Sequence, residues 1–138
     1  MIVLKKLFVF LLFFLCGCSN KVILNCSYVD NSSILGSRKV NDIIKFGNDR
    51  IVSYNRNVSF YFRSGIKDSS SIYKTIRLEG RALKKYIGGK YRVSKSGDGI
   101  NMSFNSRKIN NLKYIGVDSS YGYDQVMGVY NELGFVCK

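Results

Sequence analysis

The chain has 138 residues and no histidine. The side chains best suited to catalysis or metal binding are therefore its four cysteines and nine carboxylates. Without histidine the sequence lacks Ser-His and Cys-His catalytic pairs and the commonest metal ligand. The carboxylates are scattered and form no DxD or other tight acidic cluster, which argues against a calcium loop. A two-carboxylate glycosidase pair stays open. We therefore expect no enzyme activity, no metal and no cofactor.

Glu79 is the one carboxylate in an unusual position. On a helix drawn over residues 71–87, it falls on the apolar face between Tyr86 and Ile72. A buried carboxylate needs a partner or an altered pKa. Glu79 could be an acid that faces a ligand pocket. The pattern favours the alternatives, in which the helix kinks near Gly80 or Glu79 reaches an arginine.

Two of the cysteines lie close together, in the stretch Leu15-Cys16-Gly17-Cys18. This stretch ends an apolar run that follows Lys5 and Lys6. The run is too short for a comfortable membrane span, which needs about 20 apolar residues. A basic start, a short apolar core and small residues are typical of a signal peptide.

The end of this segment resembles the lipobox of bacterial lipoproteins. Leu15 matches the position three residues before the cut, Gly17 the position just before it, and Cys18 the residue that follows. The resemblance implies that the Cys18 sulfur takes a diacylglyceryl group and that residues 1–17 are removed. The mature chain would then be anchored by acyl chains such as palmitate to the cell membrane, on its extracytoplasmic face. Two acyl chains hold a protein far better than one.

Cys26 and Cys137 are the cysteines that remain after this processing. An export signal and an even number of cysteines predict a disulfide between them. Cys26 shares a strand face with Leu24 and Tyr28, and Cys137 shares one with Phe135, so both sulfurs could point into one core. Two free buried thiols are the alternative.

The two cysteine-containing segments also carry a second resemblance. The stretches Leu24-Asn25-Cys26 and Gly134-Phe135-Val136-Cys137 are together similar to small, uncharacterised lipoproteins of low-GC Gram-positive bacteria. This resemblance implies the compartment and the disulfide, and it implies no activity.

The rest of the chain, residues 18–138, has no proline, repeat or linker, and we expect a single domain. Alternating apolar residues predict strands at 22–28, 40–46, 50–54, 57–63, 90–95, 100–104 and 112–117, with a last strand at Cys137. Helical periodicity predicts a helix over 71–87 that ends at Gly88. A second helix, begun by a cap at 118–120, would bury a stripe from Tyr123 to Leu133. We expect an α+β fold, a curved antiparallel sheet with two helices packed on one side.

The predicted helix over 71–87 carries basic residues opposite its apolar face. The formal charge of the chain is +13, and it stays at +11 once Lys5 and Lys6 are removed. Such a face suits anionic headgroups, teichoic acid phosphates or another polyanion, although a merely solvated helix face remains the alternative. The candidate polyanion-binding residues are Lys74, Arg77, Arg81, Lys84 and Lys85, and Lys90, Arg92 and Lys95 follow on the next strand.

These features predict a non-enzymatic binding or interaction module, tethered to the membrane, whose basic face meets anionic components of the cell envelope. The alternative is an envelope or immunity lipoprotein that binds a protein partner such as a hydrolase or a transporter. Nucleic acid is not an expected partner of a chain held outside the cell.

Four Asn-x-Ser triplets begin at Asn25, Asn31, Asn57 and Asn101. Such triplets are glycosylation sites in a eukaryotic secretory route. The lipobox argues against that route, so the sequence assigns the triplets no function.

Overall fold

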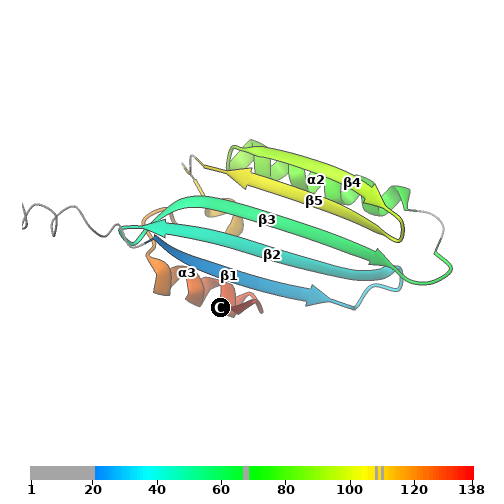
Figure 1. Cartoon of the computed structure of the whole chain (residues 1–138), viewed down its shortest axis with the longest axis horizontal. Coiled ribbons are helices and arrows are strands. Elements are labelled where there is room, and N and C mark those ends of the chain that lie inside the picture. Colours follow the sequence, from blue (N-terminus) through cyan, green and yellow to red (C-terminus); the bar gives the residue numbers. More distant parts are fainter. Residues whose placement is uncertain (1–20, 67–68, 108, 110) are drawn as a thin grey trace, which may run out of the picture.

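The fold is one six-stranded antiparallel sheet with two helices (Figure 1). The computed structural model describes residues 21–66, 69–107, 109 and 111–138. The strands follow the spatial order β4-β5-β3-β2-β1-β6. The elements are β1 (Lys21–Asp30), β2 (Gly36–Gly47), β3 (Arg50–Phe62), α2 (Ser70–Tyr86), β4 (Lys90–Ser96), β5 (Gly99–Ser106), the 3-10 helix η1 (Lys113–Ile115), α3 (Tyr123–Glu132) and β6 (Val136–Cys137).

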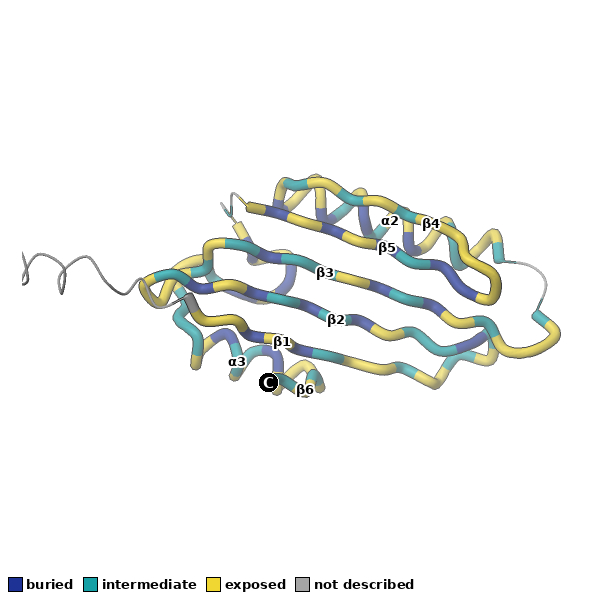
Figure 2. The backbone as a smooth tube through the Cα atoms, in the orientation of Figure 1, coloured by how far each residue is buried: buried dark blue, intermediate teal, exposed yellow. Residues whose placement is uncertain are grey.

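Two tight turns set the register of the sheet. Asn48 and Asp49, with φ of 53° and 56°, close the hairpin between β2 and β3. Both residue types tolerate the left-handed region that a two-residue hairpin requires. Gly97, with φ of 46°, serves the same purpose between β4 and β5. Buried and more exposed residues then alternate along much of β2 and β3 (Figure 2), as expected when successive side chains of a strand point to opposite faces.

Helix α2 packs on β4 and β5 through Ile76 and Leu83, which are buried. Gly80 lies at the contact. A Cβ there would stand 2.6 Å from the ring of Tyr91 and 3.1 Å from the sulfur of Met102. Glycine is therefore required for the close approach of the helix to the sheet. The helix is continuous through Gly80, from Ser70 to Tyr86.

Helix α3 packs near β1 through Val126 and Tyr130. Its predicted caps at 118–120 are wrong, because Asp118 instead accepts hydrogen bonds from Ser120 within its own turn. The first N–H of the helix, that of Tyr123, donates to Asp49 Oδ1 at 2.9 Å. The start of α3 is thus held by the β2–β3 turn, far away in sequence, as well as locally by Gln125, whose Oε1 accepts a hydrogen bond from the N–H of Gly122 at 3.0 Å.

Several predicted boundaries also change. The segments 50–54 and 57–63 are one continuous strand, β3, and the predicted strand at 112–117 contains the 3-10 helix η1. β2 begins earlier than predicted, at Gly36. Leu133, assigned to the buried stripe of the second helix, is exposed. The predicted helix over 71–87 is correct to one residue at each end.

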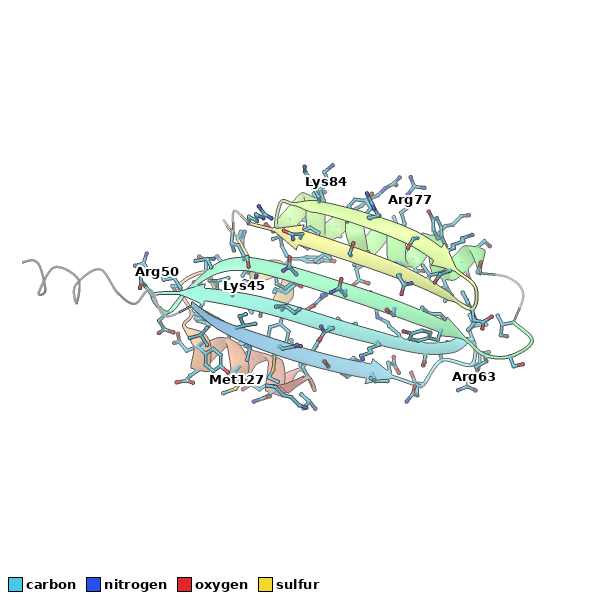
Figure 3. The ribbon with its side chains drawn as sticks, viewed as in Figure 1. Lys45, Arg50, Arg63, Arg77, Lys84 and Met127 are labelled. Carbon is cyan, nitrogen blue, oxygen red and sulfur yellow. A yellow bond between two sulfur atoms is a disulfide. The ribbon has the colours of Figure 1, made fainter. Side chains whose placement is uncertain are left out.

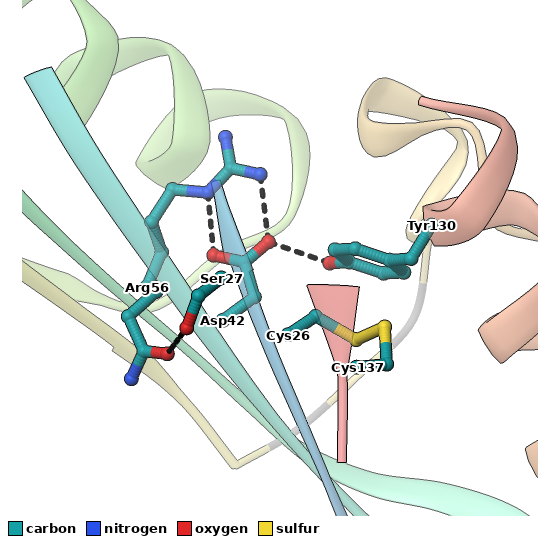
Figure 4. The surroundings of a disulfide bond; sticks show 7 residues. Cys26, Ser27, Asp42, Arg56, Tyr130 and Cys137 are labelled. Carbon is teal, nitrogen blue, oxygen red and sulfur yellow. Dashed lines mark hydrogen bonds and ion pairs between the residues drawn. A yellow bond between two sulfur atoms is a disulfide. The ribbon is translucent and has the colours of Figure 1, made fainter. Parts of the chain in front are cut away.

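The predicted disulfide between Cys26 and Cys137 is confirmed (Figure 4). The two residues face each other across the β1–β6 ladder, and Cys26 is buried in the core. The bond closes a loop of 111 residues. A crosslink over such a loop stabilises the fold by about 4–5 kcal/mol in the chain-entropy account. Among the described residues, the hydrophobic core lies within residues 24–137, so the segment 19–138 contains all of that core.

The predicted fold class, α+β with two helices on one side of an antiparallel sheet, is confirmed. Both helices cover the same face, which carries the core. The opposite face, here called the uncovered face, is formed by odd-numbered residues at 23–29 of β1, 37–45 of β2, 53–61 of β3 and 101–105 of β5, and by even-numbered residues at 90–94 of β4.

Candidate functional site

The covered face holds a buried carboxylate, Asp42 of β2, with no exposed surface. Arg56 of β3 grips it with two hydrogen bonds, from Nε to Oδ1 at 2.8 Å and from Nη2 to Oδ2 at 2.7 Å. The hydroxyl of Tyr130, from α3, donates to Oδ2 at 2.6 Å, and that of Tyr54 donates to the same oxygen at 3.2 Å. Figure 4 shows Arg56 and Tyr130 converging on this carboxylate.

A second carboxylate extends the cluster to the other helix. Glu79 of α2 accepts a hydrogen bond from Arg56 Nη1 at 3.4 Å and one from Arg38 Nη2 at 2.6 Å. The interpretation of Glu79 as an acid that reaches an arginine is therefore confirmed. The resulting Asp42 cluster consists of Arg38, Asp42, Tyr54, Arg56, Glu79 and Tyr130, and it links α3, β2, β3 and α2.

The charge states in the cluster follow from burial and from Asp42. Burial raises the pKa of Tyr54 and of Tyr130, and the negative charge of Asp42 beside them raises it further. Burial alone would lower the pKa of Arg56, but its hydrogen bonds to Asp42 and the negative charge there outweigh burial and raise it. At neutral pH the tyrosines are neutral donors and Arg56 is a cation. Both oxygens of Asp42 are engaged, which is the arrangement of a structural clamp.

The surface of α2 carries the candidate polyanion-binding residues. All five of them are exposed, and Figure 3 shows Arg77 and Lys84 projecting from the helix away from the sheet. In the described part of the chain there are three ion pairs, all within the Asp42 cluster. The stripe therefore meets solvent as uncompensated positive charge. We call these five residues, Lys74, Arg77, Arg81, Lys84 and Lys85, the basic stripe.

The basic residues of the next strand divide between the two faces of the sheet. Lys90 and Arg92 are exposed on the uncovered face of β4. Lys95 instead points to the helix side, where its Nζ lies 4.7 Å from the ring centroid of Tyr73. The structure thus brings the basic stripe together on one helix and separates it from Lys90 and Arg92 by the edge of the sheet.

Sequence reasoning missed the role of Asp42. The residue alternates with Val40 and Ile44, which are buried, so strand periodicity alone could have placed it in the core. A carboxylate at such a position signals a buried partner. Its partners lie 12, 14 and 88 residues away in the chain, and no local pattern identifies them.

The predicted lipidation site is not among the residues that the structure describes. Cys18 and the predicted signal peptide of residues 1–17 are outside the described residues. Within the described ranges, no three His, Cys, Asp or Glu side chains gather in a way that could hold a metal ion. The helices described here are all too short or too polar to cross a membrane.

Comparisons with protein-family models, with curated proteins and with solved structures find no match for this chain. Arguments about its function therefore rest on its own residues.

Because the pKa of Tyr130 is raised in the folded chain, the free energy of unfolding should fall as the pH rises above the ordinary tyrosine pKa of about 10. At pH 7, Tyr130→Phe should lower the free energy of unfolding by about 1.5–3 kcal/mol, because it removes a hydrogen bond to a charged group. Above about pH 10 the unfolded wild-type chain loses the Tyr130 proton, whereas the folded chain keeps it. The wild type should therefore lose about 1.4 kcal/mol per pH unit that the variant does not lose.

Urea unfolding of both proteins between pH 7 and pH 11 measures this effect. The stability difference between them should be constant up to about pH 10 and then narrow. A difference that stays constant up to pH 11 would show that Tyr130 ionises equally easily in both states.

Proposed function

We propose that this chain is a lipid-anchored protein of the extracytoplasmic membrane face whose basic stripe binds phosphate groups of anionic envelope components. The observation that carries the proposal is the exposure of the five cations of the stripe along one helix, without an ion pair in the described part of the chain. The phosphates could belong to lipid headgroups or to an envelope polymer, and both present a dense array of negative charge.

The local charge balance supports this proposal. Between residues 69 and 97 the sequence has one acidic residue, Glu79, against eight basic ones. Glu79 points toward Arg38 and Arg56, so it does not neutralise the stripe. Each Lys or Arg close to an anionic membrane surface contributes about 1 kcal/mol, within a Debye length of about 10 Å. Five such residues on one helix face are enough for measurable, salt-dependent binding.

The lipid anchor and the stripe would act together. An acylated Cys18 would hold the domain within a short distance of the membrane, which raises the effective concentration of the stripe at its target. A weak interaction of α2 is then sufficient to orient the domain. The lipobox resemblance of residues 15–18 supports the anchor, and the geometry of α2 supports the contact.

Removal of two stripe charges tests the contact. In the segment 19–138, Arg77→Gln combined with Lys84→Gln should weaken binding to vesicles that contain one third phosphatidylglycerol by about 30-fold at low salt, corresponding to about 2 kcal/mol. Vesicle co-sedimentation measures this effect, and poly(glycerol phosphate) in a parallel titration distinguishes a polymer from a headgroup as the preferred source of phosphate.

The matched control is Arg50→Gln combined with Lys113→Gln, which removes the same charge from exposed positions outside the stripe. It should weaken binding by less than about threefold. If both double variants lose the same affinity, net charge alone drives binding and the stripe is not a site.

The anchor has its own test in a bacterium that processes lipoproteins. The full chain should yield a mature protein that begins at Cys18 and carries the mass of a diacylglyceryl group, and it should partition into detergent. Cys18→Ser should abolish both properties, whereas Cys16→Ser should keep them. Intact-mass measurement decides the question: an unmodified thiol at Cys18, or retention of residues 1–17, contradicts the anchor.

A further inference from the structure

The uncovered face of the sheet has an unusual composition. Because strand side chains alternate with a period of two, both polar residues of an Asn-x-Ser triplet point the same way. Three of the four triplets lie in strands, at Asn25 in β1, Asn57 in β3 and Asn101 in β5, and all three present their asparagine and serine on the uncovered face. The triplets that glycosylation does not explain therefore have a common structural location.

The register of the sheet aligns these residues in rows. Ser27, Asn41, Asn57 and Ser103 are successive partners across β1, β2, β3 and β5. Asn55 and Asn105 pair in the next row. Asparagine and serine are poor strand formers compared with threonine or valine. Their concentration on one face is a local conflict of the kind found at functional sites.

Much of the hydrogen-bonding capacity of this face is unused. Ser27 Oγ donates to Asn41 Oδ1 at 2.9 Å, which leaves the amide N–H groups of Asn41 free to donate. Two oxygens along β3, Ser53 Oγ and Asn55 Oδ1, are buried and have no hydrogen-bond partner in the described part of the chain. A buried acceptor without a donor is destabilising, so these two oxygens are a local cost of the polar composition of this face.

The face is also hollowed and positively charged. A depression of about 580 Å³ lies over β1, β2 and β3 and reaches Val136 of β6 and Lys138, and its volume is within the size range of ligand sites. Asn57, Ser59 and Tyr61 line it from β3, and Lys39 lines it from β2. The ring of Tyr61 is about half exposed, at 54%. The strand positions of this face carry basic residues and no carboxylate.

We propose that the uncovered face binds an acidic glycan, a chain of sugars that carries carboxylate or phosphate groups. Side-chain amides and hydroxyls are suited to the neighbouring hydroxyls of a sugar, since they both donate and accept hydrogen bonds. The ring of Tyr61 offers an apolar surface for the C–H face of a sugar. Lys39 and Lys45 on β2 are placed to neutralise its acid groups, and Arg92 on β4 extends the positive charge. This site is separate from the basic stripe and does not depend on the function proposed for it.

The test uses the segment 19–138 with tetragalacturonate as the carboxylate probe, a phosphomannan oligosaccharide as the phosphate probe and maltotetraose as the neutral control. Amide resonances of β1, β2 and β3 should shift with at least one acidic probe at about 1 mM, and less with maltotetraose. Asn57→Ala combined with Ser59→Ala should lower the affinity for that probe at least tenfold and leave vesicle binding unchanged. Arg77→Gln combined with Lys84→Gln should weaken vesicle binding and leave the affinity for the acidic probe unchanged.

The matched control is Asn131→Ala combined with Ser119→Ala, which removes the same groups from exposed positions away from the uncovered face. It should leave glycan affinity unchanged. Three results overturn the proposal: no shifts on the uncovered face with either acidic probe, equal binding of maltotetraose, or shifts on this face caused by anionic vesicles instead of glycan.

Discussion

The buried carboxylate of Asp42 is the constraint on which the arrangement of this domain depends. A charge without exposed surface costs several kcal/mol unless hydrogen bonds and an opposite charge compensate it. Arg56 from β3, Tyr54 and Tyr130 supply that compensation. Because Tyr130 belongs to α3 and Arg56 also reaches Glu79 of α2, one carboxylate on the central strands joins both helices to the same side of the sheet.

That one-sided packing creates two solvent-facing surfaces with different chemistry. The outer side of α2 presents the long, cationic side chains of the basic stripe, which suit a diffuse array of phosphates. The uncovered face of the sheet presents amides and hydroxyls at fixed strand spacing, with fewer cations, and suits a ligand recognised by hydrogen bonds. The edge strand β4 separates them, so they can be occupied independently.

Local sequence patterns predicted the elements that depend on residues close together in the sequence or on the regular alternation of side chains along a strand. The apolar spacing of α2 was sufficient to predict the helix, and the export signal with the shared strand faces of Cys26 and Cys137 was sufficient to predict the disulfide. β3 was predicted as two strands, 50–54 and 57–63, because the polar residues Asn55 and Arg56 interrupt its apolar alternation. Arg56 nevertheless lies on the covered face, since Asp42 neutralises it there.

Other features depend on contacts that no local pattern contains. The start of α3 is held in part by Asp49, 74 residues away in the chain, and not by the nearer Asp118. The apolar run at 112–117 forms a 3-10 turn that buries Leu112, Ile115 and Val117 instead of a strand. For the candidate sites, helical periodicity together with charge identified the basic stripe. The uncovered face required the strand register, because its rows are built from residues of four different strands.

The most direct test of the Asp42 clamp is hydrogen exchange combined with urea unfolding for Asp42→Asn, with Asp98→Asn as the exposed control. Loss of the buried charge leaves Arg56 without its partner, so the free energy of unfolding should fall by about 3–5 kcal/mol, and amides of both α2 and α3 should lose protection together. The control should change stability by no more than about 0.5 kcal/mol. If Asp42→Asn costs less than about 1 kcal/mol and both helices keep their protection, the clamp does not organise the domain.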